Sequence, residues 1–359
     1  MKPLLSGLLI MTLCFAASGR TISPDHQFIE YTGRIDFTDS TAPAFSYSGV
    51  SIRACFTGTN ISAVLDDNIG GNIYNLLLDG KLVDTLHVAR GLKTYVLAKG
   101  LENRAHEIEL FKRTEEMFGK TRFCGFIVDE GSSLIPIQNK RSRLIEYIGD
   151  SITCGYGNEG GLDQTFGPDT ENHFMTYAAI TSRQFNARHL AVCKSGIGIY
   201  RNYDGPVEGS PDNMAQFYPR IFLWDPKPEY DFAETPDLVC INLGTNDFST
   251  QGGDPICFRD NYLRLIDTLQ TRYDNPDIVC LLGPMLSDEA LATVRHLLQN
   301  IVADANKEGQ GRVSFFEMSP QTGDRGMGTD YHPTVAQHQK NALELTGFIA
   351  KLKGWEISR

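Results

Sequence analysis

The C-terminal part of this chain alternates short apolar runs with longer amphipathic runs, and this alternation restricts the fold that it can adopt. The longer runs carry apolar residues at helical spacing, as in Leu263, Ile266 and Leu269. Repeated strand–helix units predict an α/β fold, in which a parallel sheet has helices on both faces and a flavodoxin-like strand order. The expected strands are 143–148, 188–193, 237–243, 277–282 and 312–318, and the expected helices are 172–185, 261–273, 289–306 and 335–352.

The preceding part of the chain has an all-β pattern. Runs rich in β-branched and aromatic residues alternate there with turn residues, and Asp79-Gly80 between two apolar runs predicts a tight hairpin. Short strands at this spacing indicate a β-sandwich of the jelly-roll type. We therefore expect a β-domain over residues 20–137 and an α/β domain over 140–359. Expected strand runs in the β-domain include 45–56, 73–78, 94–97 and 106–111.

Residues 1–19 have the features of a secretory signal peptide. Lys2 precedes an apolar run over 4–17, and small residues follow it at 17–19. The run is too short for a spanning helix, so an uncleaved anchor is the less favoured alternative, and no other segment is apolar enough to span a bilayer. Export to the periplasm, cell surface or medium is expected. Lipid anchoring at Cys14 stays open, although Leu13 occupies a position where a lipobox has a small residue.

The charge balance restricts the class of partner. The 359-residue chain has 44 acidic and 33 basic residues and a formal net charge of −11. Binding to a nucleic-acid backbone requires clustered Lys and Arg, so nucleic acid is not an expected partner. Neutral substrates such as sugars remain open, and the sequence does not indicate an oligomeric state.

Cysteine and histidine positions do not form a metal-binding pattern. None of the eight cysteines has C-x-x-C spacing, so we expect no metal site. Cys240 and Cys280 end apolar runs, which favours buried free thiols, although one disulfide stays possible. His173, His189 and His338 lack acidic or cysteine partners at ligand spacing. We expect these histidines on the surface or in helices.

Glycine-marked polar segments follow three of the expected strands. In a parallel sheet, ligands bind beyond the carboxyl ends of the strands, so these segments should meet in one cleft. A fourth polar segment precedes the last helix. The four segments are Gly149-Asp150-Ser151, Ser195-Gly196, Gly244-Thr245-Asn246-Asp247 and Asp330-Tyr331-His332-Pro333.

These segments contain the groups that ester hydrolysis requires. Ser151 lies where a strand turns into a helix and can act as nucleophile, while His332 can accept its proton. The backbone of Gly196, or alternatively of Gly198, and the amide of Asn246 can bind the oxyanion. Thr153 replaces the second glycine of the G-x-S-x-G motif, so this is not an α/β-hydrolase nucleophile elbow.

The four blocks, in this order, resemble those of SGNH (GDSL-type) hydrolases. Segments 147–157, 242–247 and 329–333 are most similar to carbohydrate esterase family 2, whose members also carry an N-terminal jelly-roll domain. The resemblance implies deacetylation of xylan, glucomannan or a related acetylated saccharide without metal or cofactor. It implies Ser151 as nucleophile, His332 as base, and the Ser151 N–H, Gly196 and Asn246 as the oxyanion hole.

The sequence departs from the wider superfamily at the third catalytic residue. That pattern places an Asp three residues before the His, but Thr329 stands there and Asp330 is only two residues before His332. Two arrangements follow: Asp330 completes a triad, or a backbone carbonyl orients His332 in a dyad.

Alternatives remain open for the role of Trp224 and for the activity of the protein. Trp224, in a long connection, can either line the substrate cleft or hold its loop against the core. The rival functions are an SGNH esterase or lipase with a different acyl substrate, and a carbohydrate-binding protein without catalytic activity.

Overall fold

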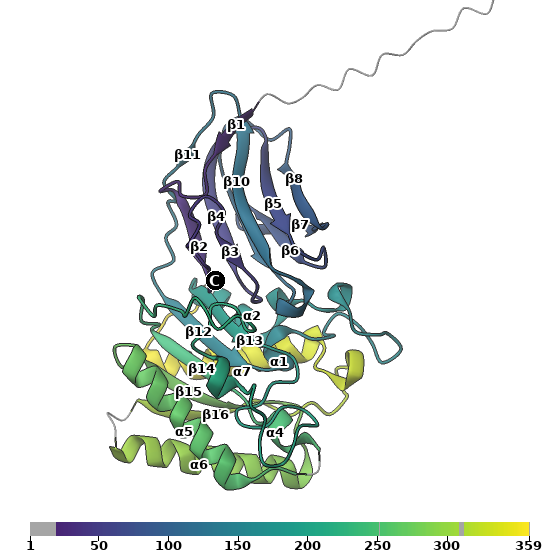
Figure 1. Cartoon of the computed structure of the whole chain (residues 1–359), viewed down its shortest axis with the longest axis vertical. Coiled ribbons are helices and arrows are strands. Elements are labelled where there is room, and N and C mark those ends of the chain that lie inside the picture. Colours follow the sequence, from purple (N-terminus) through teal and green to yellow (C-terminus); the bar gives the residue numbers. More distant parts are fainter. Residues whose placement is uncertain (1–18, 251, 309–311, 359) are drawn as a thin grey trace, which may run out of the picture.

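The computed structural model describes residues 19–250, 252–308 and 312–358, which form a β-domain stacked on an α/β domain (Figure 1). The predicted signal peptide and Cys14 lie outside the described residues, except that Gly19 is the first residue of β1. The last strand of the β-domain ends at Ile135 and the first strand of the α/β domain begins at Leu144. No helix in the described part of the chain combines the length and the hydropathy that crossing a membrane requires.

The β-domain consists of two sheets whose facing side chains form one core, as the jelly-roll prediction required. The first sheet has the order β1-β10-β5-β8, with β3 paired to β10, and the second has the order β11-β4-β9-β6-β7, with β2 paired to β4. The first comprises β1 (Gly19–Ile22), β3 (Ala44–Phe45), β5 (Ile61–Asp67), β8 (Gly91–Ala98) and β10 (Thr121–Asp129). The second comprises β2 (Ile29–Thr32), β4 (Ser51–Gly58), β6 (Ile73–Leu78), β7 (Lys81–His87), β9 (Arg104–Lys112) and β11 (Leu134–Ile135).

Local sequence predicted one turn of this domain correctly and one strand wrongly. Asp79 and Gly80 have φ of 50° and 76° and join β6 to β7, which confirms the hairpin. The expected strand 45–56 is divided, because β3 and β4 belong to different sheets. Gly49, with φ of 77°, lies in the break, where a Cβ atom would come within 2.8 Å of two histidine rings. A continuous strand is incompatible with that backbone conformation.

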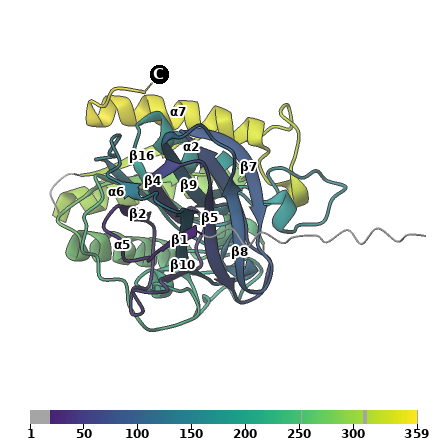
Figure 2. The ribbon, with the colours of Figure 1, turned by 90° about the horizontal axis from the view of Figure 1, so that it is seen from above.

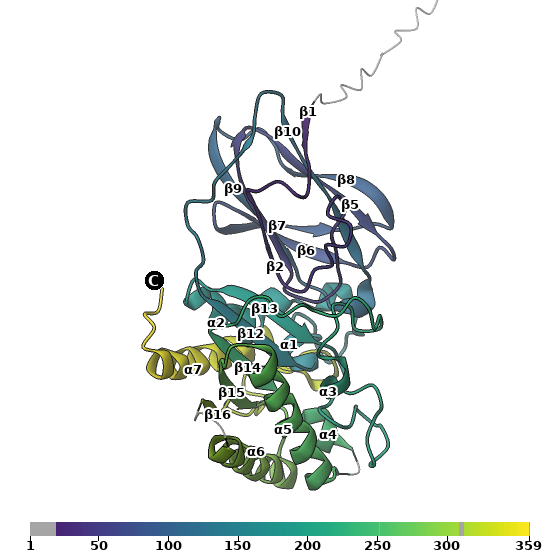
Figure 3. The same ribbon diagram turned by 60° about the vertical axis from the view of Figure 1, so that its left-hand side comes forward.

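The α/β domain has a five-stranded parallel sheet of order β13-β12-β14-β15-β16, which confirms the flavodoxin-like prediction. One face packs on α2 and α7 and the other on α3, α5 and α6, so the domain has three layers (Figures 2 and 3). The strands are β12 (Leu144–Gly149), β13 (Arg188–Cys193), β14 (Leu238–Asn242), β15 (Asp277–Leu282) and β16 (Val313–Glu317). The α-helices are α1 (Ser151–Cys154), α2 (Tyr177–Gln184), α3 (Met214–Phe217), α4 (Thr245–Ser249), α5 (Pro255–Arg272), α6 (Asp288–Glu308) and α7 (Val335–Lys353). Short 3-10 turns are η1 (Glu116–Phe118), η2 (Pro168–Thr170), η3 (His173–Met175) and η4 (Thr329–Tyr331).

Capping residues explain the two helices whose starts differ from expectation. The predicted helix 172–185 is interrupted at Thr176, whose side chain accepts a hydrogen bond from the Ala179 N–H and so begins α2 there. Helix α5 begins before the predicted 261–273, because Asp254 accepts from the N–H groups of Ile256 and Cys257.

We expected three histidines on the surface or in helices: His173 lies in η3 and His338 in α7, whereas His189 lies in β13, and all three are buried. His173 and His189 lie where the β-domain packs on the sheet, with their Nε2 atoms 2.7 Å apart. Burial lowers the pKa of His173 to about 4, so its ring is neutral. One of the two Nε2 atoms can therefore donate a hydrogen bond that the other accepts. The surface prediction was wrong because the sequence did not show that the second domain covers this face.

Candidate active site

Ser151 is the first residue of α1, directly beyond the carboxyl end of β12, and the residue is 7% exposed. Asp150 caps the helix by accepting a 3.0 Å hydrogen bond from the Ile152 N–H. The turn is so tight that a Cβ on Gly149 would come within 2.0 Å of Thr153 Oγ1. The glycine therefore allows the strand to turn sharply and direct Ser151 into the cleft.

His332 lies at the end of η4, just before α7, and its Nε2 is 2.8 Å from Ser151 Oγ. Its Nδ1 is 3.2 Å from the main-chain carbonyl oxygens of both Thr329 and Asp330. Carbonyl oxygens only accept hydrogen bonds, so Nδ1 carries the proton and Nε2 of the neutral ring can accept from the serine hydroxyl. Desolvation lowers the pKa of His332 below its ordinary value, and the two carbonyl contacts oppose that effect.

Asp330 does not contact the imidazole through its carboxylate. Its Oδ2 accepts a 2.7 Å hydrogen bond from the Tyr156 hydroxyl, and its backbone is left-handed with φ of 49°. This backbone turns the carboxylate away and leaves the carbonyl facing the ring of His332. Of the two arrangements open in the sequence, the geometry matches the one in which backbone carbonyls orient His332, while the Asp330 carboxylate bonds Tyr156 instead of the ring.

The predicted oxyanion donors line the same cleft as Ser151 and His332. Gly196 follows β13 with φ of 78°, and Asn246 lies in the first turn of α4 beyond β14. The Asn246 amide is fixed by a 2.8 Å hydrogen bond from Nδ2 to the Ile197 carbonyl. The alternative donor Gly198 directs its N–H at Asn202 Oδ1, 3.1 Å away, so Gly196 is the residue placed at the cleft.

The cleft has a volume of about 790 Å³ and is lined by residues of both domains. Three exposed aromatic side chains belong to its walls: Tyr203 is 61% exposed, Trp224 is 56% exposed and Tyr331 is 66% exposed. Trp224 also packs edge-on against Phe217 with a centroid distance of 5.4 Å. Both expectations for Trp224, lining the cleft and contacting the core, therefore describe its position.

Buried carboxyl groups hold the loops around the nucleophile. Asp247 accepts hydrogen bonds of 2.9–3.1 Å from the N–H groups of Ile199, Tyr200 and Arg201, which ties the loop after β13 to α4. Burial raises the pKa of Asp247 to about 6, and burial together with the Asp247 charge raises the pKa of Asp150 to about 7. These acids bind backbone donors and have no contact with His332.

Comparison with known proteins agrees with this geometry. A family model for the N-terminal domain of carbohydrate esterase 2 matches residues 31–137, and one for the GDSL-like lipase/acylhydrolase family matches residues 147–340. A solved family two carbohydrate esterase from Clostridium thermocellum, in complex with cellohexaose, is 38% identical with a TM-score of 0.86, covering 91% of this chain and 99% of that chain. The chain belongs to carbohydrate esterase family 2.

Curated relatives of this family 2 protein are named as esterases. Cellulase/esterase CelE of Acetivibrio thermocellus is 38% identical over 95% of this chain, which spans only 41% of CelE. An acetylxylan esterase / glucomannan deacetylase of Cellvibrio japonicus is 26% identical, with 98% of both chains covered. The likeness to CelE thus concerns only part of a longer protein.

Sequence reasoning missed several residues of this family 2 cleft. Tyr156 lies within a recognised block, yet its ring packing on His332, at a centroid distance of 4.2 Å, was not predicted. Glu115, Glu116 and Met117 enter the cleft from the connection between β9 and β10 of the β-domain. No residue pattern in this connection indicates that it contacts the cleft, because the connection lies far along the chain from most of the four blocks.

A buried cluster beside the cleft has atoms of the kind that bind metals. Glu115, Cys154 and Glu171 place one ligand atom each within 4.8 Å of one another. Both oxygens of Glu115 already accept hydrogen bonds from Ser195, and the buried amine of Lys112 supplies positive charge nearby. Ser195 thus satisfies Glu115, whereas the buried Glu171 Oε1 has no hydrogen-bond partner among the described residues. Burial raises the pKa of Glu171 well above its ordinary value, which favours the neutral acid there.

Proposed function

We propose that this protein is a carbohydrate O-acetyl esterase that uses Ser151 as nucleophile and His332 as general base. The 2.8 Å contact between Ser151 Oγ and His332 Nε2, at the base of the cleft, carries the proposal. Membership of family 2 and the names of the relatives support the same reaction class.

Acylation begins with attack of Ser151 Oγ on the acetyl carbonyl carbon, while His332 Nε2 takes the hydroxyl proton. The positive charge that forms on the ring is stabilised by the Thr329 and Asp330 carbonyls at Nδ1. The Ser151 N–H, the Gly196 N–H and the Asn246 amide receive the oxyanion. Collapse of the tetrahedral intermediate breaks the bond to the sugar oxygen, which leaves as the hydroxyl after receiving the proton from His332.

Deacylation repeats these steps with water. His332 Nε2 takes a proton from a water molecule, whose oxygen attacks the acetyl-Ser151 carbonyl. The second tetrahedral intermediate uses the same three donors, and its collapse returns the proton to Ser151 Oγ and releases acetate. The described residues supply every group in this cycle, so the proposal includes no metal or cofactor.

The walls of the cleft favour a saccharide as the alcohol part of the ester. Tyr203, Trp224 and Tyr331 present large aromatic surfaces that can pack against the apolar faces of sugar rings. Glu116 and Lys194 add polar groups for sugar hydroxyls. We therefore place an acetylated xylan, glucomannan or related oligosaccharide in the cleft.

We also propose that the protein is exported, because residues 1–19 have the pattern of a signal peptide. A polymeric substrate outside the cell requires such an exported enzyme. Expression with and without residues 1–19, followed by cell fractionation, tests this; equal retention of both forms in the cytoplasm contradicts it.

Acetate release from acetylated xylan, acetylated glucomannan and a chromogenic acetate ester tests the proposed reaction. Ser151→Ala should lower kcat by about 10⁴-fold or more, because the nucleophile and base act as a unit. Release by the wild type and not by the variant supports the esterase. Preference for long acyl esters would instead favour a lipase, and saccharide binding without any ester hydrolysis would favour a non-catalytic binding protein.

A further inference from the structure

Glu115 belongs to the β-domain by sequence but lies inside the catalytic centre of the other domain. It follows β9 in the connection to β10, and the residue is only 1% exposed. Its carboxylate lies between α1, which begins with Ser151, and the loop after β13, which carries Gly196. No other part of the proposed mechanism uses this charge.

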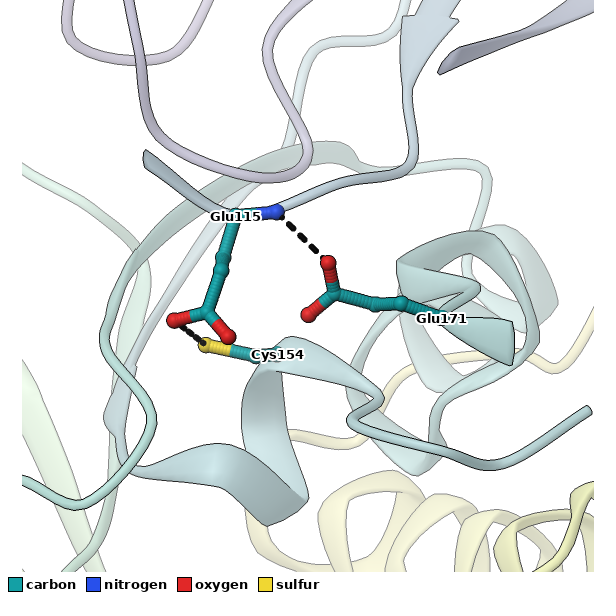
Figure 4. Close-up of side chains that lie close together, drawn as sticks. All are labelled: Glu115, Cys154 and Glu171. Carbon is teal, nitrogen blue, oxygen red and sulfur yellow. Dashed lines mark hydrogen bonds between the residues drawn. The ribbon is translucent and has the colours of Figure 1, made fainter. Parts of the chain in front are cut away.

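Both carboxylate oxygens of Glu115 bind the residue before Gly196. Oε2 accepts a 2.8 Å hydrogen bond from the Ser195 N–H, and Oε1 accepts a 2.5 Å hydrogen bond from the Ser195 hydroxyl. Oε2 also accepts from the Cys154 thiol, with the sulfur 3.7 Å away, at the end of α1 (Figure 4). One carboxylate thus contacts two of the three segments that carry the proposed oxyanion donors.

The backbone of Glu115 is itself held firmly. Its N–H donates a 2.8 Å hydrogen bond to Glu171 Oε2 (Figure 4), and its carbonyl accepts from the buried Lys112 amine at 3.2 Å. Lys112 also donates to the Thr114 carbonyl at 2.6 Å, and Arg113 Nε donates to the Glu171 carbonyl at 2.8 Å. These contacts keep the carboxylate in place without help from substrate.

We propose that Glu115 is a positioning residue for the oxyanion hole, an inference that rests on the proposed esterase function. The peptide joining Ser195 to Gly196 carries the Gly196 N–H, and Gly196 has the left-handed backbone, with φ of 78°. Glycine has unusual freedom to rotate, so its N–H keeps one direction only if the preceding residue is fixed. Glu115 fixes Ser195 at two points. Through Glu115, the β-domain therefore helps to position one oxyanion donor.

The test compares Glu115→Gln and Ser195→Ala with the wild type on a chromogenic acetate ester. The Gln amide can accept one hydrogen bond but presents N–H groups toward a donor, so we expect kcat to fall about 10- to 100-fold with KM within about threefold. Ser195→Ala keeps the N–H contact and should lose less. Because both changes act on one contact, their effects on kcat in the double variant should be less than additive.

A matched control is Glu109→Gln. Glu109 is another buried β-domain carboxylate, paired with Arg141 at 2.6 Å. This variant should lose thermal stability but keep kcat. Reaction with a phosphonate ester, whose tetrahedral adduct requires the oxyanion donors, should slow in the Glu115 and Ser195 variants and not in the control.

The outcomes separate this inference from the esterase proposal. If the wild type releases acetate and Ser151→Ala does not, the esterase proposal is supported independently of the result for the Glu115 variant. Unchanged kcat and phosphonate reactivity in folded Glu115→Gln would overturn the positioning role, as would fully additive effects in the double variant. If Glu115→Gln does not fold, Ser195→Ala decides: wild-type kcat and phosphonate reactivity would overturn the inference, and a selective loss of both supports it.

Discussion

The Tyr156 hydroxyl donates a 2.7 Å hydrogen bond to the carboxylate of Asp330, whose main-chain carbonyl faces the Nδ1 atom of His332. Asp330, two residues before His332, thus orients the ring through its backbone, while its side chain holds Tyr156. Side-chain and backbone roles of Asp330 can therefore be separated by mutation.

Asp330→Asn should lower kcat by less than about 10-fold, because the substitution keeps the main-chain carbonyl at His332 and the Asn oxygen can still accept from Tyr156. Asparagine tolerates the left-handed backbone at this position. His332→Ala should lower kcat by about 10³-fold or more, because it removes the base. Steady-state kinetics on one acetate ester compares the two variants, and equal losses would restore Asp330 as a triad member.

Activity should decline in acid with a midpoint below pH 6.5. The base is the neutral imidazole, so activity is lost as the pH falls through the pKa of His332, which desolvation places below 6.5. The Asp330 charge raises this pKa, so Asp330→Asn should move the midpoint lower. A pH profile of kcat/KM measures both. A midpoint near 7 that disappears in Glu116→Gln would instead assign the transition to Glu116, whose pKa is raised by burial to about 7.

Asn246→Ala should lower kcat by about 10²–10³-fold with little change in KM, because it removes an oxyanion donor. Asn246→Asp keeps the size of the side chain but places an acceptor near the developing negative charge, so it should lose at least as much. Initial-rate kinetics over a range of ester concentrations separates kcat from KM. An effect confined to KM would make Asn246 a substrate-binding residue and not an oxyanion donor.

Glu146→Gln should destabilise the protein by about 3–5 kcal/mol, because it leaves a buried cation without its counter-charge. Arg34 of the β-domain lies 3.3 Å from Glu146 of β12, and both side chains are fully buried. The Tyr218 hydroxyl also donates to this carboxylate at 3.0 Å. Urea denaturation measures the loss. Glu229→Gln, in the exposed pair with Lys227, should leave the midpoint unchanged, and an equal shift in both variants would refute the interpretation.

The sequence by itself determined the two-domain architecture, the order of the parallel sheet and the four blocks that meet at its edge. Strand and helix periods are local properties, and parallel strands necessarily bring their carboxyl ends together. Ser151, Gly196, Asn246 and His332 could therefore be named before the fold was known, and they line one cleft.

Only the tertiary structure decided which atoms contact one another within that site. The backbone angle of Asp330 selected its carbonyl over its carboxylate, and domain packing brought Glu115 to Ser195 and buried His173 against His189. These contacts join segments far apart in the chain, and no residue pattern near either partner records the other. Their positions follow from the packing of whole surfaces, which local propensity does not encode.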